Sequence, residues 1–592
     1  MTRAVTRRVL LRGIGSAAAV AATPCIVLGA PALLRGRPGD PAASDLFSLG
    51  VGSGDPTEDS VVLWTRLAPD PLNGGGMPQR PVQVKFKVAL DRGMSQVVRA
   101  GHTLALPDAG HAVHVTVTDL APNTWYWYRF ESLGARSRIG RTRTFPAWYQ
   151  QTQRMRFALV SCQNFAAGYY AAYRDMLSQQ LDFVVHVGDY IYESGASSSP
   201  LLPGRDHSGG EIFTLSDYRN RYAQYRLDSD LQNVHASLPF LCTWDDHEVD
   251  NNYAGATAEE GAPYVGAEFA QRRRNGFQVY AESMALRPKN RLLTPQGRMR
   301  IHRELQFGSL ANFYMLDTRQ YRTDQPAEDG FGSTDADAVA IEPVFGEKLY
   351  DASGIEEPGA TLLGDAQEDW LSERLYFSRA RWNVLAQQIM MMPWNLRAAG
   401  RKQIELDATL PAAQKAAILG LIDRVANLYN VDAWDGYADA RRRLLSLVAR
   451  SGARNPIVLG GDIHAAWAAN LLQDFTAPAT SDMVAGEFVC TSITSTFLSP
   501  DPRPTDFIVR ATLPDNPHIA HFNGLYRGYC ICDVNQQRWR TMYRSVLGNL
   551  QDPSPLALVP QVNSVLGTDK TFELEAGFNV PHSGKRLMSL NY

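Results

Sequence analysis

Polar residues that can hold metal ions recur at four places along this 592-residue chain, each directly after a short apolar run. The clusters are SCQ at 161–163, GDYIY at 188–192, WDDHE at 244–248 and GGDIH at 460–464. The side chains that they offer as metal ligands are Cys162, Asp189, Tyr192, Asp245, Asp246, Asp462 and His464. Carboxylates, an imidazole, a thiol and a phenol in one repeated context predict a hydrolase that uses two metal ions.

The residue types indicate two different cations. Asp189 is placed to bridge a pair of ions about 3.5–4 Å apart, which can activate a water and stabilise the charge on a phosphoryl oxygen. A thiolate from Cys162 favours iron or zinc over magnesium, and a phenolate from Tyr192 suits a ferric ion. Asp246 and Asp462 are hard oxygen ligands for calcium, magnesium or manganese. We therefore expect one softer, iron-type site beside one hard-cation site.

Taken singly, these residues have simpler interpretations. An aspartate after a strand is more often a helix N-cap or turn residue than a ligand, and a free cysteine is commonly a buried core residue. Four such positions in one chain favour the metal centre. His247 either buttresses the ligands, binds the phosphoryl group or donates a proton to the leaving oxygen, and we predict that it is catalytic together with Asp189. His186 is predicted to be a core residue, whereas Arg319 and Arg322 either contact phosphate or form structural salt bridges.

The apolar runs before the clusters must position them. These runs are MRFALV (155–160), LDFVVHV (181–187), LPFLCTW (238–244) and NPIVLG (455–460). Short runs that are apolar at nearly every position, separated by segments long enough for helices, are typical of strands buried between helical layers. Ligands of open α/β sheets gather beyond the carboxyl ends of such strands, where all the candidate residues fall. Further core strands are predicted in 307–319, 381–391 and 486–494.

At these motifs the sequence resembles the PhoD-type alkaline phosphatases, relatives of the purple acid phosphatases among the calcineurin-like metallophosphoesterases. The resemblance runs from SLGVGSGDPTEDSVVLWTRL (48–67) through SCQNF, VGDYIYE, WDDHEVDNNY and LDTRQYR to GGDIH. It implies an α/β fold in which a metallophosphoesterase α-β-β-α sandwich follows a small all-β, fibronectin III-like sandwich domain. It also implies hydrolysis of phosphomonoesters by metal-activated hydroxide, with phosphodiesters as further candidate substrates.

The resemblance also assigns the metals. It implies Fe³⁺ held by Cys162, Asp189, Tyr192 and His464, and Ca²⁺ held by Asp189, Asp246 and Asp462, with other divalent metals left open. In the purple acid phosphatases, Asn and His stand where this chain has Asp246 and Asp462, so oxygen donors replace nitrogen donors. A further ligand of the wider fold comes from a strand like 381–391, which offers Gln387 and Gln388 but no histidine.

The first 32 residues read as a twin-arginine export signal. Arg7 and Arg8 precede an apolar stretch from Gly13 to Ala30, and Ala30-Pro31-Ala32 resembles a cleavage site. A basic-flanked membrane anchor is the alternative interpretation. The signal predicts the twin-arginine export machinery as a partner and a periplasmic or extracellular enzyme. No later stretch approaches the roughly 18 uninterrupted apolar residues that span a bilayer, so no transmembrane segment is expected in the mature chain.

Composition sets wider limits. With 45% hydrophobic and 20% charged residues, the chain is globular and long enough for two or more domains. The formal charge of −3 falls to −7 without residues 1–32, which does not indicate binding to nucleic acid or anionic membranes. Six cysteines become five without Cys25, and an odd number in an exported protein predicts at least one unpaired thiol, for which Cys162 is the candidate. Cys530 and Cys532 are predicted to be core residues.

Residues 45–147 have a different pattern from the rest of the chain. Apolar and polar residues alternate between Gly, Pro, Asn and Asp, which predicts a small antiparallel β-sandwich, and DLAPNTWYWYRFE (119–131) resembles a fibronectin III corner and strand. The predicted organisation is therefore a signal at 1–32, this β-domain at 45–147, a catalytic domain at 154–547 and a C-terminal extension at 548–592 that either covers the active site or frays. The polar insertion at 194–210 is expected to select substrate.

Two rival functions follow from the same residues. The first is a phospholipase D-like phosphodiesterase on the same fold, because a metal centre does not distinguish monoesters from diesters or phospholipids. The second is an exported binding protein whose β-domain grips a surface and whose metal site is structural. A closed coordination shell without hydrolysis would indicate the second, whereas an open position implies catalysis.

Overall fold

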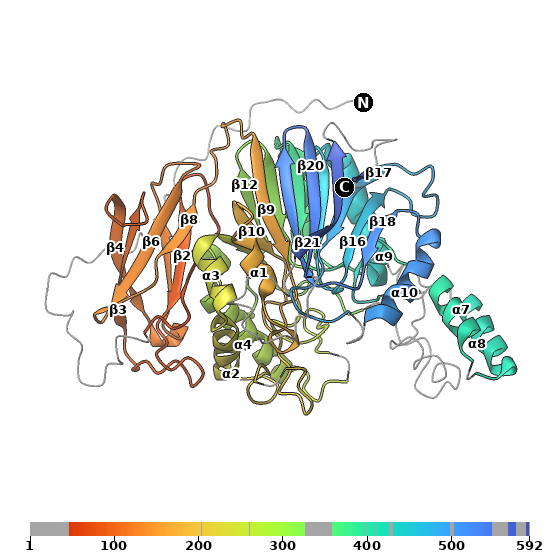
Figure 1. Cartoon of the computed structure of the whole chain (residues 1–592), viewed down its shortest axis with the longest axis horizontal. Helices are drawn as coiled ribbons and strands as arrows, with labels where there is room; N and C mark the ends of the chain where they lie inside the picture. The colour runs from red at the N-terminus through yellow and green to blue at the C-terminus, as the bar shows by residue number, and fades with distance from the viewer. Residues whose placement is uncertain are drawn as a thin grey trace, which may run out of the picture.

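The computed structural model describes residues 46–202, 204–259, 261–325, 358–395, 397–408, 410–424, 430–497, 502–546, 566–575 and 588–590. The predicted export signal and much of the predicted C-terminal extension lie outside these ranges. The described chain contains two large sheets that face each other, with a strand-rich N-terminal part at one side (Figure 1). Among the described residues, no helix is both long enough and apolar enough to cross a bilayer.

The first large sheet has ten strands, and its centre contains the three predicted strands that lead to the first three clusters. Strands β9 (Arg154–Val160), β10 (Phe183–His186) and β11 (Phe240–Cys242) run parallel. Antiparallel strands β19 (Gly528–Asn535) and β20 (Arg538–Val546) form a hairpin that continues the sheet beyond β9. Strands β21 (Leu566–Glu575) and β22 (Met588–Leu590) complete that edge, so part of the predicted C-terminal extension pairs as sheet.

The second large sheet has seven strands and contains the strand that leads to the fourth cluster. Its order is β12 (Arg303–Phe307), β13 (Ala311–Met315), β14 (Trp382–Ala386), β15 (Pro456–Gly460), β17 (Met483–Val489), β16 (Ala466–Leu472) and β18 (Ile519–Asn523). Strands β13, β14, β15 and β17 are parallel neighbours. The core strand predicted within 307–319 is β13, and it begins only at Ala311 because Gly308 takes a positive φ of 57° and the chain turns between β12 and β13.

Alternating side chains of the strands build the layers. On β9, Phe157 and Leu159 face the second sheet, while Ala158 and Val160 face helices. Those helices are α1 (Ala171–Met176), α2 (Leu215–Arg226), α3 (Ser229–Ser237) and α4 (Ala267–Ser283). Helices α6 (Asp365–Phe377) and α9 (Ala438–Ser451) cover the outer face of the second sheet. The predicted α-β-β-α sandwich is therefore confirmed.

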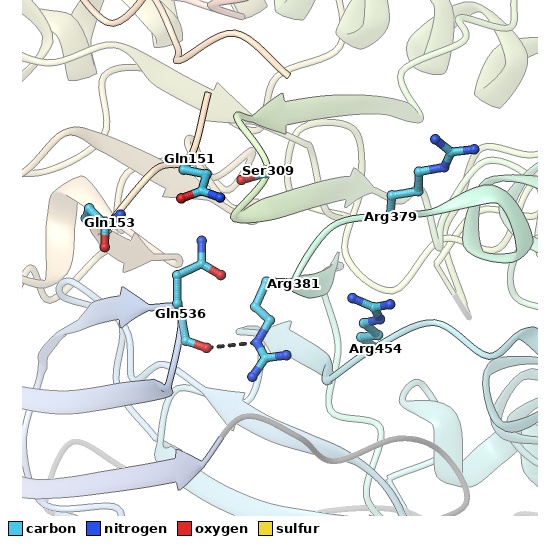
Figure 2. Close-up of a pocket in the computed structure, with 7 residues that line it drawn as sticks. All are labelled: Gln151, Gln153, Ser309, Arg379, Arg381, Arg454 and Gln536. Carbon is cyan, nitrogen blue, oxygen red and sulfur yellow. Dashed lines mark hydrogen bonds between the residues drawn. The ribbon is translucent and has the colours of Figure 1, made fainter. Parts of the chain in front are cut away.

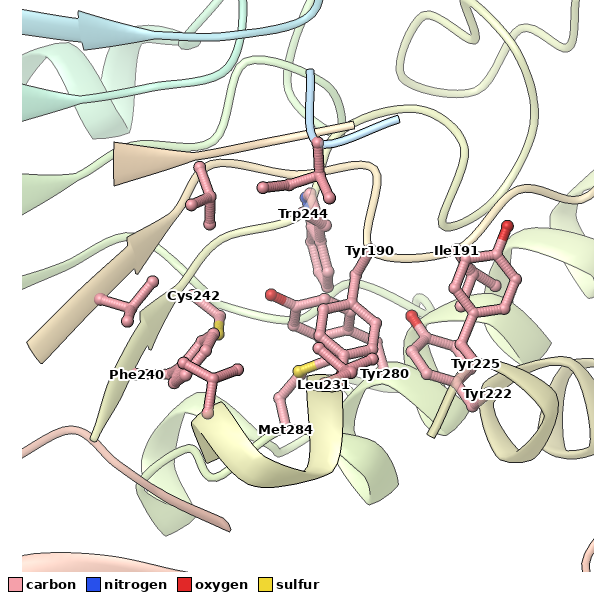
Figure 3. Close-up of a cluster of buried hydrophobic side chains, with 14 of the residues drawn as sticks. Tyr190, Ile191, Tyr222, Tyr225, Leu231, Phe240, Cys242, Trp244, Tyr280 and Met284 are labelled. Atoms are coloured by element: carbon pink, nitrogen blue, oxygen red, sulfur yellow. The ribbon is translucent and has the colours of Figure 1, made fainter. Parts of the chain in front are cut away.

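The helical layer under the first sheet also anchors the chain next to the clusters. The Tyr190 ring stacks on Tyr222, and Trp244 stacks on Phe277 with ring centroids 4.3 Å apart. Figure 3 shows Tyr190, Tyr222 and Trp244 within this buried cluster. Because Tyr190 follows Asp189 and Trp244 precedes the aspartates of WDDHE, core packing fixes both polar segments.

A separate group of helices lies beyond the second sheet. Helix α7 (Arg397–Leu406) contacts both α8 (Ala412–Arg424) and α10 (Pro502–Thr512) at the side of the molecule far from the N-terminal part (Figure 1).

The N-terminal part is a sandwich of one five-stranded sheet and three edge strands of the ten-stranded sheet around its own apolar cluster. One sheet contains β3 (Val82–Ala89), β4 (Val97–Ala105), β6 (Trp125–Ser132), β7 (Ala135–Arg136) and β8 (Gly140–Arg143). The facing layer contains β1 (Val51–Gly54), β2 (Val61–Arg66) and β5 (Ala112–Val117). The hydroxyl oxygen of Tyr126 accepts a hydrogen bond from the backbone N–H of Ala121 at 2.8 Å, which is the predicted tyrosine corner.

This sandwich is joined to the larger one by backbone pairing. Strand β1 lies parallel to β11, with Gly54 opposite Phe240, so β1, β2 and β5 extend the ten-stranded sheet. Beside this junction, Arg303 donates to Asp55 Oδ1 through Nη2 at 2.7 Å and to the Cys242 carbonyl at 2.9 Å. Arg303 therefore links the N-terminal sandwich to both large sheets.

Candidate metal centre

The four clusters converge where the carboxyl ends of the strands of both large sheets meet. Cys162 follows β9, Asp189 follows β10, Asp245 and Asp246 follow β11, and Asp462 and His464 follow β15. The backbone N–H of Cys162 donates to the Gly188 carbonyl at 3.1 Å, which holds the first two clusters together. The structure thus brings together all the residues that the sequence predicts as ligands.

The backbone at four of these residues is strained. Cys162, Asp189, Asp462 and His464 have φ values of 57°, 56°, 66° and 57°. A residue with a side chain rarely adopts this left-handed conformation, which costs roughly 1–2 kcal/mol, and such strain gathers at functional sites. The chain has this strained conformation at four of the positions where a polar side chain enters the centre.

The first group of ligand atoms belongs to Cys162, Asp189 and His464, whose donor atoms all lie within 4.8 Å of one another. Tyr192 joins this group, because its hydroxyl donates to Asp189 Oδ2 at 2.9 Å and lies 3.1 Å from His464 Nε2. Ser495 Oγ donates to the same Tyr192 oxygen at 2.7 Å. Thiol, carboxylate, phenol and imidazole therefore face one point.

The tautomer of His464 leaves a lone pair at this point. Its Nδ1 donates to the Thr496 carbonyl at 2.8 Å, so Nε2 carries no proton in the neutral ring, and burial lowers the pKa of His464 to about 3. The Tyr192 hydroxyl has one proton for two close acceptors, Asp189 Oδ2 and His464 Nε2. A cation between these three groups would satisfy the acceptor that the proton leaves unpaired.

The second group is made only of carboxylates. Oxygens of Asp245, Asp246 and Asp462 lie within 4.8 Å of one another, and a third group of the same size joins Asp189, Asp246 and His247. Asp189 therefore shares one group with Cys162 and another with Asp246. This is the position that a bridging carboxylate requires.

Electrostatics indicate that these carboxylates fit cations. Burial raises the pKa of Asp189 and of Asp462 well above the usual range, and neighbouring aspartates add to both shifts. Asp189 Oδ1 and Asp246 Oδ1 are buried and accept no hydrogen bond from the described residues. Buried carboxylates are otherwise paired or bound to metal, so the donor set fits a hard cation next to the softer site formed with Cys162.

Arg319 places a positive charge next to the carboxylates of the second group. It is fully buried and donates to Asp245 Oδ1 at 2.5 Å and to Asp432 Oδ1 at 2.8 Å. Arg322 also donates to Asp432, at 2.7 Å. The sequence left two roles open for Arg319 and Arg322, phosphate contact or a structural salt bridge. In the structure both form buried salt bridges. Arg319 pairs closely with Asp245, whereas its distance to Asp246 Oδ1 is 3.5 Å.

His247 lies at the edge of the centre with its own carboxylate partner. Nδ1 of His247 and Oε2 of Glu193 are 2.7 Å apart, and Glu193 Oε1 accepts the backbone N–H of Asn251. Burial opposes protonation of His247, but Glu193, Asp246 and Asp189 outweigh it and raise its pKa well above the usual range. A protonated imidazole at this place can donate a proton to a departing oxygen.

Several residues that hold the centre were not identified from the sequence. Glu248 accepts backbone N–H groups of Asp189, Tyr190 and Asp245 at 3.1, 2.7 and 2.8 Å, which fixes the segments after β10 and β11. Glu193 and Asp432 are the other two. Glu193 and Glu248 end the motifs VGDYIYE and WDDHE, so an acid directly after a candidate site residue was the available signal.

The two glutamines after β14 are engaged elsewhere. Gln388 donates to the Trp244 carbonyl at 2.7 Å and accepts from Thr318, while Gln387 donates to the Ile389 carbonyl and accepts from Trp434 Nε1. His186 is buried in β10 as predicted, and its Nδ1 accepts from Gly188 N at 3.3 Å. All five described cysteines are buried and unpaired, which confirms the predicted free thiol.

A cavity of about 270 Å³ opens beside Tyr192 and His464. Residues of the 194–210 insertion, including Ser194 and His207, line it together with Asn164. The insertion predicted to select substrate therefore borders the candidate metal centre.

Two facing sheets between helical layers, with grouped metal-binding side chains at the carboxyl ends of their strands, define a metallophosphoesterase. Similarity to known proteins identifies the family. The model of the PhoD-like phosphatase family matches residues 157–543, and that of the PhoD-like phosphatase N-terminal domain matches residues 34–146. The chain belongs to the PhoD-like phosphatase family and is a metal-dependent phosphoester hydrolase, as the motifs predicted.

Two relatives support this assignment. Alkaline phosphatase D of Bacillus subtilis (strain 168) is 43% identical over 502 residues, which cover 84% of this chain and 77% of that protein. The solved structure of PhoD matches with a TM-score of 0.75 and 38% identity, covering 93% of this chain and 94% of that one.

Proposed function

We propose that the protein is an alkaline phosphatase that hydrolyses phosphomonoesters at a centre of two unlike cations. The observation that carries the proposal is the position of Asp189, which belongs both to the group with Cys162 and His464 and to the group with Asp246 and His247. Family membership and the name of the Bacillus relative support the substrate class.

The chain offers a separate set of donors to each cation. Cys162, Tyr192 and His464 together with Asp189 suit Fe³⁺, whereas Asp246 and Asp462 with Asp189 suit Ca²⁺. Asp245 was predicted as a further ligand, and its bond to Arg319 favours a role in holding Asp246 in place. When bound, the two cations would activate water and neutralise phosphoryl oxygens.

The protein's own residues complete the reaction. Asp189 belongs to both donor sets and so keeps them adjacent. Glu248 fixes the backbone of Asp189 and Asp245. His247, oriented by Glu193, protonates the leaving oxygen. The cavity beside Tyr192 has room for the organic part of an ester.

Metal analysis and hydrolysis assays on the purified mature protein test this function. We expect about one iron per chain, calcium-dependent turnover of a phosphomonoester, and slower turnover of a bis-ester and of phosphatidylcholine. Asp189→Asn should abolish turnover and reduce metal content. Cys162→Ser should lose iron selectively, whereas Cys242→Ser, which changes another buried free cysteine outside the ligand groups, should keep it. A fully active, metal-replete D189N protein would refute the proposal.

We further infer export by the twin-arginine machinery to the periplasm or beyond. Arg7 and Arg8 of the predicted signal support this inference. Fractionation of cells that express the full chain should find phosphatase outside the cytoplasm, and R7K/R8K should retain it inside, whereas R3K should not. Equal export of R7K/R8K would contradict the inferred route.

A further inference from the structure

The end of the sandwich opposite the candidate metal centre contains a groove lined by three arginines. Arg379, Arg381 and Arg454 share a cavity of about 360 Å³ with Gln151, Gln153 and Gln536 (Figure 2). A serine completes the lining, and no acidic side chain of the described residues belongs to it. We call this feature the arginine groove.

The charges of these arginines are not neutralised by the described part of the chain. Arg381 Nε donates to the Gln536 carbonyl at 2.8 Å, which leaves its two terminal amino groups free. Arg379 and Arg454 form no hydrogen bond or ion pair through their guanidinium groups with any described residue. In contrast, Arg143 and Arg154 in the adjoining groove are paired with Asp182 and Asp533.

Three unpaired guanidinium groups around one cavity are suited to a multiply charged oxyanion. The planar fork of each guanidinium matches two oxygens of a phosphate group, and charge-assisted bonds of this kind are about twice as strong as neutral ones. The glutamine amides of the lining offer further N–H donors. A carboxylate ligand would use only part of this donor set, whereas a tetrahedral dianion offers oxygens to more than one guanidinium group. In Figure 2 the Arg379 guanidinium points away from those of Arg381 and Arg454, which leaves these two arginines as the main anion contacts.

We propose that the arginine groove is a second oxyanion site, which binds a phosphate group independently of the metal centre. The phosphate is either free inorganic phosphate or the phosphate of an ester, since both present the same oxygens.

The place of the groove in the fold separates it from the reaction. Arg381 directly precedes β14, and Arg454 lies two residues before β15, whose opposite end leads to Asp462. A strand rises about 3.3 Å per residue, so the six steps from Arg381 to Gln387 place the two sites roughly 20 Å apart. A phosphate in the groove therefore does not compete with a phosphate at the metal centre. Both strands join the two sites directly through the core.

Equilibrium dialysis of the metal-loaded protein with radiolabelled inorganic phosphate tests the proposal. We expect two phosphates per wild-type chain and one per chain in R379A/R454A, with phosphate affinity at the lost site reduced at least tenfold. R92A/K289A removes two positive charges from exposed residues outside the groove and should still bind two. Turnover of a phosphomonoester should be unchanged in both variants, because neither touches the candidate centre.

Equal phosphate binding by R379A/R454A and wild type would overturn the proposal, whereas one phosphate in wild type and none in R379A/R454A would count only against phosphate binding at the metal centre. Circular dichroism and thermal unfolding of R379A/R454A should match wild type, since both side chains are exposed. Competition with dimethyl phosphate then shows whether the groove accepts a phosphate that is esterified twice. Displacement of the groove phosphate would show that the site accepts diesters. No displacement would show that the site requires a phosphate dianion. Either result supports an oxyanion site.

Discussion

His247 depends on Glu193 for both its orientation and its charge. The 2.7 Å contact fixes Nδ1, so only Nε2 is free to point toward a substrate. Glu193 is itself held by the backbone N–H of Asn251 at 2.9 Å. At the scale of single residues, the proposed proton transfer therefore depends on a carboxylate that belongs to none of the three groups of candidate ligand atoms.

Glu193→Gln should separate proton donation from metal binding. We expect turnover of an alkyl phosphate to fall about 100-fold, because His247 loses the carboxylate that keeps it charged and oriented. Turnover of a nitrophenyl phosphate should fall much less, since that leaving group departs as an anion. Metal content should stay at the wild-type level. Equal losses on both substrates would contradict the role of His247 as the proton donor.

His186 couples stability to pH. Burial lowers its pKa to about 3, so the folded protein keeps it neutral while the unfolded chain protonates it near pH 6.5. Its contribution to stability is complete above pH 6.5 and is lost as pH falls toward 3. Between pH 7.5 and 5.5 this loss amounts to about 1.4 kcal/mol.

His186→Asn keeps an acceptor for Gly188 N and removes the titrating ring. Urea unfolding should show that wild type loses about 1.4 kcal/mol more than H186N between pH 7.5 and 5.5. The comparison of the two proteins cancels the pH dependence of the other groups. A parallel decline of both proteins would contradict the assignment.

At the scale of elements, the sharp turns after the strands decide where the ligands lie. Gly188 has a φ of +119° between β10 and Asp189, and a Cβ there would overlap Asp245 Cβ and lie 2.6 Å from Asp245 N. Only glycine allows the segments after β10 and β11 to approach this closely.

Gly188→Ala should push these two segments apart. We expect a loss of about 3 kcal/mol in the free energy of unfolding, together with reduced metal content and turnover. Gly134→Ala is the matched control, because Gly134 also has a positive φ, of +84°, but has no atom within 4 Å of its Cβ position. It should cost about 1 kcal/mol and leave metal content unchanged. Similar metal loss in both variants would refute the packing argument.

The same elements show why the sequence predicts some features and not others. Strands β9 and β15 follow their predicted ranges within a residue, because strands buried on both faces appear as uninterrupted apolar runs. The turn at Gly308 was included in the strand predicted within 307–319, because Phe307, Leu310 and Ala311 around it are apolar. Asp432 was also missed, because its contact with Arg319 spans 113 positions and leaves no local pattern.

At the scale of the whole molecule, Arg303 links three strands that lie far apart in the sequence. It starts β12 in the second sheet, contacts the end of β11 in the first, and pairs with Asp55 after β1. Both Arg303 and Asp55 are buried. Removing one member of a buried ion pair leaves an uncompensated charge, which is strongly destabilising.

Arg303→Met should lower the free energy of unfolding by about 3–5 kcal/mol. Arg154→Met is the control, because it breaks an ion pair whose arginine side chain is 60% exposed, and it should cost no more than about 1 kcal/mol. Calorimetry should show one transition for wild type, since β1 continues the large sheet. Two transitions in wild type would contradict this coupling of the N-terminal sandwich to the rest.

The backbone is left-handed at Cys162, Asp189, Asp462 and His464. At these positions, selection for stability and selection for activity therefore favour different residues. Glycine would relieve strain at each of these positions, yet it would delete a candidate ligand. Random variation screened only for expression should therefore enrich glycine there, while variation screened for phosphatase activity should exclude it. If activity ceased to be selected, these four positions would be among the first to drift, and a descendant could keep the whole fold while losing its chemistry.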